Sequence, residues 1–420
     1  MEERRLKTVA KLRYGDALPK EKRSSGTTPV MGSNGQVGLH AEANTSGKTI
    51  VVGRKGSFGK VRFVPSSAFV IDTAYFIDSR STSCDLRWLY YVLTSIGLDT
   101  ITRDTGVPGL SRELAHNAMV PVCNPADEVL ISRYLDNAEL RIARAIQARS
   151  EVAMLLREAR STMINELVLK GEVRGAPTVD SGIPGIDRIP GDWNLMRAKY
   201  VWSPTNVRSR AGDEERLSVS SVSGVVPRSW KKVTMFEASS YVGHKVVEPG
   251  NLVINSLWAW ATGLGVSQHH GIVSPVYGVF ELRPEARSDL VYLDYLLRSN
   301  AMQWQFRVHS KGIWKSRLQL SDDAFFRMVL PLPPLSEQRA IAQEIAARTS
   351  DLDKAVAAAE REISLLREYR IRLIADVVTG KKDVRAEAAS LPDVDPLELA
   401  SVLSGVVSSE DEEVEDSDGD

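Results

Sequence analysis

Cysteine is scarce in this chain. Its 420 residues include two, Cys84 and Cys123, so a framework of structural disulfides is excluded and a reducing compartment is favoured. Long apolar runs are also missing, and the opening segment MEERRLKTVAKL mixes both charges where a secretion signal has an apolar core. We therefore expect a cytoplasmic protein without a membrane span. The length predicts two or three globular units.

Two segments match nucleotide-binding or catalytic motifs only in part. The loop GRKGSFGKV departs from a phosphate-binding loop because Arg54 replaces its first glycine and Val61 replaces its hydroxyl residue. The segment VCNPADE, from Cys123, is similar to the Asn-Pro-Pro-aromatic motif of amino-group methyltransferases, but Ala126 and Asp127 replace the second proline and the aromatic residue. No glycine-rich cofactor loop precedes it. The sequence thus predicts no catalytic residue and no cofactor-binding residue.

Metal-binding patterns are missing too, since the adjacent His269 and His270 have no matching cluster of Cys, His or carboxylates. The net charge of −1 hides an uneven distribution. The segment 408–420, SSEDEEVEDSDGD, carries eight acidic residues and no base, so in the remainder 53 bases face 46 acids. We expect a basic body followed by an acidic disordered tail, residues 381–420.

An internal repeat is the strongest feature present. The segment LLREARSTMINELV from Leu155 aligns without gaps on LLREYRIRLIADVV from Leu365, and Pro121 falls on Pro331 at the same separation of 210 residues. Each repeated segment belongs to a long pattern of apolar residues at helical spacing. In the second copy the pattern runs from Ile341 to Val377.

The second helix is expected to begin with Ser336 as its N-cap and to end before Gly380. It would be about 60 Å long, and its apolar stripe is narrow. Two such helices can cover each other's stripes as an antiparallel coiled coil, although each could instead pack on its own domain. The predicted organisation is a globular unit at 1–122, a long helix at 123–170, a linker at 171–192, a second unit at 193–332 and a second helix at 333–380.

Both globular units are predicted to be α+β, because short β-branched runs accompany one clear helix in each. Glycine-rich loops carry basic residues between the strands, and such loops suit the approach of a DNA strand, although they could be tight turns with solvated lysines. The tryptophans of the second unit could equally belong to its core. The candidate DNA-binding residues are Asn34, Arg54, Lys55, Ser57, Lys60 and Arg112 in the first unit, and Trp258, Trp260, His269, Lys311, Trp314, Lys315 and Arg317 in the second.

These segments together resemble a known family. LPLPPLSEQRAIAQEI, SLWAWATGLGVSQHHGIVSP and SKGIWKSRLQL, with MGSNGQVG and GRKGSFGKV in the first half, look like the specificity subunit of type I restriction-modification systems. The resemblance covers about 6–385. It departs from the family at VPVCNPADE and in the acidic tail.

The resemblance implies two target recognition domains, each for one half of a bipartite site on double-stranded DNA, with the paired helices as spacer. It also implies two methylation subunits, which carry S-adenosylmethionine and modify adenine N6, and translocating restriction subunits that use ATP and magnesium. None of that chemistry would reside in this chain, which would carry no cofactor. The alternatives left open by the residues are a self-sufficient DNA methyltransferase and a coiled-coil scaffold that binds proteins.

Overall fold

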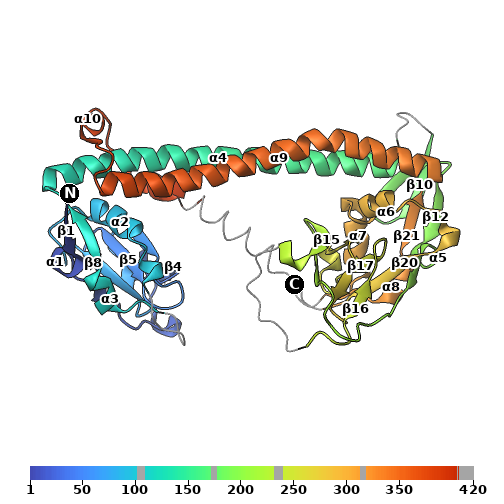
Figure 1. Ribbon diagram of the computed structural model, residues 1–420, viewed down its shortest axis with the longest axis horizontal. Helices are drawn as coiled ribbons and strands as arrows, with labels where there is room; N and C mark the ends of the chain where they lie inside the picture. The colour runs from blue at the N-terminus through green and yellow to red at the C-terminus, as the bar shows by residue number, and fades with distance from the viewer. Residues whose placement is uncertain (102–108, 172–176, 231–239, 313–317, 404, 406–420) are drawn as a thin grey trace. The chain divides into compact units, whose positions relative to one another are not determined.

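The computed structural model describes residues 1–101, 109–171, 177–230, 240–312, 318–403 and 405. The chain forms two compact units. The first unit contains residues 1–150 and 360–408, and the second contains residues 151–359. Each unit combines an α+β head with one part of a pair of long helices (Figure 1).

The first head is built on a four-stranded antiparallel sheet of order β2-β8-β5-β6. A three-stranded sheet of order β4-β3-β7 lies in the same head. The strands of the first head are β1 Glu2–Arg5, β2 Arg13–Tyr14, β3 Thr28–Gly32, β4 Gly35–His40, β5 Thr49–Gly53, β6 Val61–Val64, β7 Phe69–Val70, β8 Ala74–Asp78 and β9 Met119–Val122. Its helices are α1 Leu6–Val9, η1 Lys20–Lys22, α2 Leu86–Ser95, η2 Leu98–Thr100 and α3 Arg112–Asn117.

The second head repeats this plan. The order β13-β20-β17-β18 matches β2-β8-β5-β6, and the antiparallel pair β12·β21 matches β1·β9. Its strands are β12 Asn194–Arg197, β13 Trp202–Pro204, β14 Leu217–Ser220, β15 Gly224–Pro227, β16 Lys245–Val247, β17 Leu252–Ile254, β18 Leu264–Val266, β19 Gly271–Val273, β20 Gly278–Leu282 and β21 Val329–Leu332. Its helices are α5 Ala198–Val201, η3 Arg228–Trp230, η4 Ala259–Ala261, η5 Pro284–Ala286, α6 Leu290–Leu297, α7 Asn300–His309 and α8 Asp322–Arg327.

One helix in each head is joined to a long helix by the same device. Asp85 caps α2 by accepting a hydrogen bond from the backbone N–H of Trp88, and Asp289 caps α6 in the same way. The backbone N–H of Asp85 donates to Glu128 at 2.7 Å, and that of Asp289 donates to Gln338 at 2.8 Å. Glu128 and Gln338 are 210 residues apart, so the sequence repeat corresponds to a repeated structural joint.

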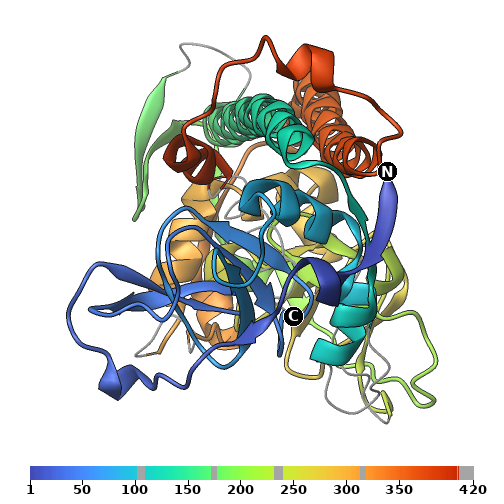
Figure 2. The same cartoon turned by 90° about the vertical axis from the view of Figure 1, so that its left-hand side faces the viewer.

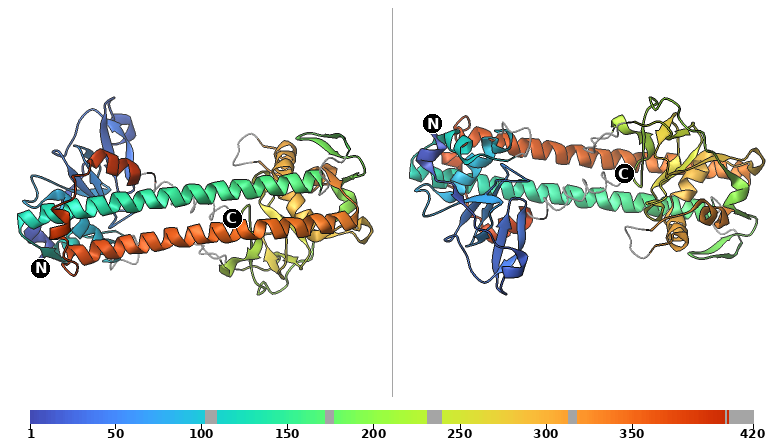
Figure 3. Two further views of the ribbon diagram at one scale, coloured as in Figure 1. Left: turned by 90° about the horizontal axis from the view of Figure 1, so that it is seen from above. Right: turned by 90° about the horizontal axis from the view of Figure 1, so that it is seen from below.

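The long helices are α4, Pro125–Lys170, and α9, Leu335–Val378. They lie side by side and run in opposite directions (Figure 3). In the first unit Arg370 meets Glu139 and Arg149 meets Glu362, and in the second unit Arg160 meets Asp353. Apolar side chains of both helices contribute to the core of each unit. The predicted antiparallel pair of long helices and the α+β heads are confirmed.

The C-terminal end of α9 matches the prediction from the sequence, whereas its N-terminal end does not. Gly380 follows the helix with a φ of +77°, a conformation that favours glycine. The start differs, because Ser336 already lies inside the helix and is not its N-cap. The carbonyl of Pro334 accepts from the N–H of Gln338, so the first turn closes two residues earlier than we predicted.

The segment predicted as a linker, 171–192, contains a folded hairpin. Strands β10 Thr178–Ile183 and β11 Ile186–Pro190 pair with each other. Ile183, Ile186 and Ile189 are buried in the core of the second unit, so this part of the expectation is wrong. Glycine and proline suggested a flexible connection, but three isoleucines supply enough apolar surface to fix the hairpin.

The predicted tail at 381–420 also begins too early. Helix α10, Arg385–Ala388, and a further helix at 396–403 pack on the first unit. The acidic segment 408–420 lies outside the described residues. In the part of the chain that the structure describes, no helix is long and apolar enough to cross a membrane.

Candidate nucleic-acid interface

An exposed tyrosine of the first head gathers two of the predicted arginines. The guanidinium carbons of Arg54 and Arg112 lie 5.1 and 4.6 Å from the ring centre of Tyr14. This ring is 45% exposed and meets the ring of Tyr75 edge-on at 5.1 Å. Tyr75 is fixed in turn because its hydroxyl donates to the carbonyl of Leu110 at 3.0 Å. The result is a partly exposed stack of an aromatic ring and two cations, suited to a phosphate or a base.

The loop after β5 holds its predicted residues in a defined conformation. The backbone N–H groups of Arg54 and Lys55 both donate to the carbonyl of Thr73, at 2.9 and 3.1 Å. A side chain at Gly59 would lie 2.2 Å from the backbone of Asp99, and its φ of +74° also favours glycine. The loop therefore needs its glycines for a tight turn, as one of the two sequence interpretations proposed.

The same loop reaches a neighbouring hairpin. The hydroxyl of Ser57 donates to the side-chain oxygen of Asn34, in the turn between β3 and β4, at 3.2 Å. Asn34, Lys55 and Lys60 are exposed. The structure thus brings Asn34 to Ser57 and Arg54 to Arg112, which were separate motifs in the sequence.

In the second head the predicted aromatic residues fall on partly exposed surface. The rings of Trp258 and Trp260 stack at 5.6 Å with 23° between their planes. His269 meets the exposed ring of Trp230 edge-on at 5.2 Å. Lys311 is exposed, and its backbone pairs with that of Gln319. Trp314, Lys315 and Arg317 lie outside the described residues.

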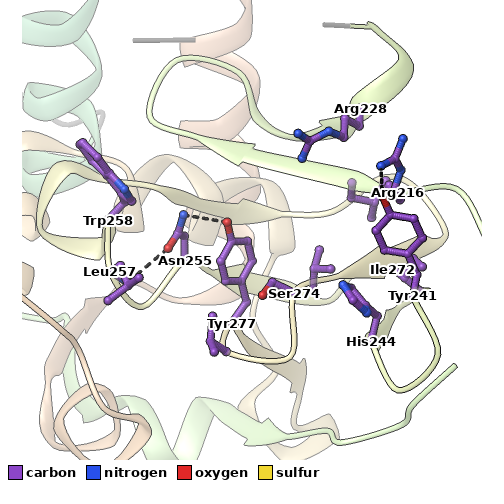
Figure 4. Close-up of a pocket in the computed structure, with 13 residues that line it drawn as sticks. Arg216, Arg228, Tyr241, His244, Asn255, Leu257, Trp258, Ile272, Ser274 and Tyr277 are labelled. Carbon is purple, nitrogen blue, oxygen red and sulfur yellow. Dashed lines mark hydrogen bonds between the residues drawn. The ribbon is translucent and has the colours of Figure 1, made fainter. Parts of the chain in front are cut away.

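Trp258 also lines a cavity of about 360 Å³ in this head (Figure 4). On one side, the guanidinium of Arg216 lies 4.8 Å from the ring centre of Tyr241 and donates to its hydroxyl. The ring of His244 meets Tyr241 edge-on at 5.2 Å. On the other side, Asn255 donates to the hydroxyl of Tyr277 at 2.9 Å. Aromatic rings, an amide and cations therefore surround one concavity.

Sequence reasoning missed Tyr14 and most of this cavity. Tyr14 had a usable signal, because it is an aromatic residue between Arg13 and Gly15 in a short polar segment. Arg216 and the pair Tyr241 and His244 had none, since they lie 25 or more residues apart in the sequence and only the fold places them together.

The two cysteines do not form a reactive site. Burial raises the pKa of the Cys84 thiol to about 11, and the carboxylate of Glu128 adds to the effect. Burial likewise raises the pKa of Cys123 to about 12. Both thiols stay protonated near neutral pH, where a nucleophilic cysteine would be a thiolate. Among the described residues, no three His, Cys, Asp or Glu side chains gather as metal ligands.

Comparison with known proteins identifies solved structures with a similar fold. No family model and no curated protein matches the chain. A chain from a structure of the complex assembly and conformational transition of the type I restriction-modification system is 13% identical, with a TM-score of 0.60 over 91% of this chain and 98% of the other.

Two further structures match over similar lengths with lower TM-scores. The S subunit of the type I system from M. genitalium is 13% identical, covering 94% of this chain and 96% of that one, with a TM-score of 0.37. The HsdS subunit from Thermoanaerobacter tengcongensis is 15% identical, covering 91% and 97%, with a TM-score of 0.40. The chain therefore has the fold of a chain in a type I restriction-modification complex, in agreement with the fold that the sequence motifs implied.

Proposed function

We propose that this chain is the DNA-binding specificity subunit of a type I restriction-modification complex, with one head for each half of a bipartite DNA site. The observation that carries the proposal is the repeated head, in which sheet order and helix joint recur on two long antiparallel helices. Two similar domains on one paired-helix stem suit two half-sites at a set separation, because half-site spacing follows protein geometry.

The heads are expected to read different half-sites because their surfaces differ. The first presents the stack of Arg54, Tyr14 and Arg112 with the Asn34 turn beside it. The second presents paired tryptophans beside a cavity. Cations would supply salt-dependent affinity through phosphates, and polar or aromatic groups would discriminate between bases.

Methylation subunits are proposed to dock on the long helices. Leu155 and Leu365 occupy equivalent positions of the repeat and are 52% and 62% exposed. Exposed apolar side chains on a helix favour contact with a partner. Two repeated positions favour two copies of the same methylation subunit, with restriction subunits in the larger cytoplasmic assembly.

The chain is proposed to be non-catalytic. In the complex, S-adenosylmethionine would be held by the methylation subunits, and ATP and magnesium by the restriction subunits. The contribution of this chain is then to position DNA, through the two heads, relative to partner active sites.

The test is adenine methylation sequencing in a host that produces this chain with its methylation subunit. We expect one bipartite motif with a constant gap. Replacing residues 1–122 by another first head should change one half of the motif and leave the other half and the gap unaltered. A change in both halves would contradict the modular assignment.

A further inference from the structure

The C-terminal segment 384–403, here named the strap, lies along α4 in the first unit (Figure 2). Arg133 pairs with Asp393 at 2.7 Å, and Arg144 pairs with Glu398. The side chains of two amide residues of α4 also donate to strap carbonyls: Asn137 to Pro392 at 2.9 Å and Gln147 to Val402 at 3.1 Å. The four α4 positions are spaced by four, seven and three residues, so they share one helix face.

The strap is shaped as an amphipathic helix at its end. Its helical part, 396–403, starts after Asp395, whose side chain accepts from the N–H of Leu397. Leu399 is 2% exposed, and Val402 and Leu403 pack against the core of the first unit. Apolar residues three and four positions apart therefore face inward, while Glu398 reaches an arginine of α4.

The equivalent face of α9 lacks the residues that hold the strap. At a separation of 210 residues, the four positions are occupied by Gln343, Ala347, Lys354 and Ala357. Gln343, Ala347 and Lys354 are exposed in the second unit. The face of α4 therefore presents two arginines and two amides to the strap, whereas the equivalent face of α9 has one amide, one lysine and two alanines.

We propose that this face of α4 is a protein-docking surface for an acidic amphipathic helix, and that the strap is its built-in occupant, which delays binding of the second methylation subunit. The inference rests on the proposed function. A methylation subunit seated on Leu365 can extend along the uncovered face of α9. One seated on Leu155 of α4 meets the strap when it extends toward Arg144, which lies 11 residues, about three helical turns, before Leu155 on the same face.

A protein occupant fits this face better than DNA does. Phosphate oxygens of DNA could meet Arg133 and Arg144 and accept from Asn137 and Gln147, but DNA has no counterpart for the buried Leu399 or for the apolar contacts of Val402 and Leu403. The strap contacts are therefore those of a helix packed on a helix. Both ion pairs are partly exposed, so each holds the strap weakly enough for exchange.

The experiment weakens the strap without touching α4. The variant D393N/E398Q removes both ion pairs, while the apolar contacts of the strap remain. The full chain is titrated with its methylation subunit, and the 1:1 and 1:2 complexes are quantified by native mass spectrometry. Since apparent affinity scales with the open fraction of a surface, we expect the second subunit to bind about fivefold tighter to the variant. The control E21Q/E42Q makes the same charge change at two exposed residues of the first head, away from the strap, and should bind like the original chain.

Each other outcome rejects the proposal in a distinguishable way. Equal second-step affinities in the original chain and D393N/E398Q would overturn the strap's role and leave the proposed function intact. Tighter non-specific DNA binding by the variant, with no change in the second step, would assign the face to nucleic acid instead. If neither chain binds a methylation subunit, the proposed function fails together with the inference. R133Q/R144Q removes the same pairs from the α4 side together with the cations of the docking surface, so it should not reproduce the full gain. A gain equal to that of D393N/E398Q would overturn the assignment of Arg133 and Arg144 to the docking surface.

Discussion

Replacing Glu139 by Gln tests how the helix pair is held in the first unit. Both carboxylate oxygens of Glu139 accept from Arg370 of α9, each at 2.7 Å, and Glu139 is 2% exposed. The substitution leaves a charged guanidinium facing a neutral amide inside the helix interface. Breaking a buried pair from one side costs about 3 kcal/mol.

The matched control lies on the same pair of helices. Arg149 and Glu362 are each 51% exposed, so E362Q should lower the free energy of unfolding by less than about 1 kcal/mol. For a unit of this size, a loss of 1 kcal/mol in the free energy of unfolding lowers the melting temperature by about 2–4 °C. Thermal circular dichroism should therefore show a loss of about 6–12 °C for E139Q and under about 4 °C for E362Q.

A double variant separates two contributions to the free energy of unfolding: the penalty for leaving Arg370 unpaired, and the net stabilisation by the ion pair. E139L/R370M removes both charges and fills the space with apolar side chains, so it should lose less stability than E139Q. Hydrogen exchange of 125–150 would locate the effect. Equal losses for E139Q and E362Q, or a larger loss for the double variant, would refute the assignment of this pair as the main polar contact of the interface.

The remaining predictions concern DNA, pH and spacing. R54A/R112A should weaken DNA binding and reduce the slope of log affinity against log salt concentration by about 2. The control K48A should leave this slope within about 1 of that of the original chain. An unchanged slope in R54A/R112A would show that these arginines do not contact DNA phosphates. Burial, with nearby cations, lowers the pKa of His116, whose Nε2 accepts from the N–H of Leu12 at 3.1 Å. The unfolded state therefore binds the proton first as pH falls below about 6.5, and stability should decline from there until the folded-state pKa is passed. Urea unfolding at pH 7.5 and 5.5 checks this, and H116Q should flatten the difference. One heptad inserted at facing positions of α4 and α9 should lengthen the methylated motif's gap by about three base pairs, from about 10 Å of helix, without altering either half.

The family resemblance and the long helices were predictable because their signals are local. Apolar residues at helical spacing, a capping context and Gly380 lie within one continuous segment, so Ile341 to Val377 could be assigned without knowing their partners. The 210-residue repeat then implied that whatever holds one helix also holds the other. Glu128 and Gln338 bear this out, because both accept from the residue that caps a head helix.

Glycine-rich loops with cations were a weaker signal. They pointed to Arg54, Ser57 and Arg112, but the sequence contained no reason for these residues to meet. Tyr14 brings the two arginines together from strand β2, 40 residues before Arg54 in the sequence. The role of these residues in DNA binding stays a prediction.

By itself, the sequence determined two repeated α+β heads and two long helices, since periodicity and turn chemistry depend on neighbouring residues. It favoured the pairing of the helices without deciding it. Tertiary structure alone decided that 178–190 folds as a hairpin, that Arg216 and Tyr241 share a cavity, and that residues after Gly380 return to α4. These outcomes depend on contacts between residues far apart in the chain. Such contacts are stable only when buried apolar surface outweighs the entropy of closing the intervening loop, and no single segment contains both sides of that balance.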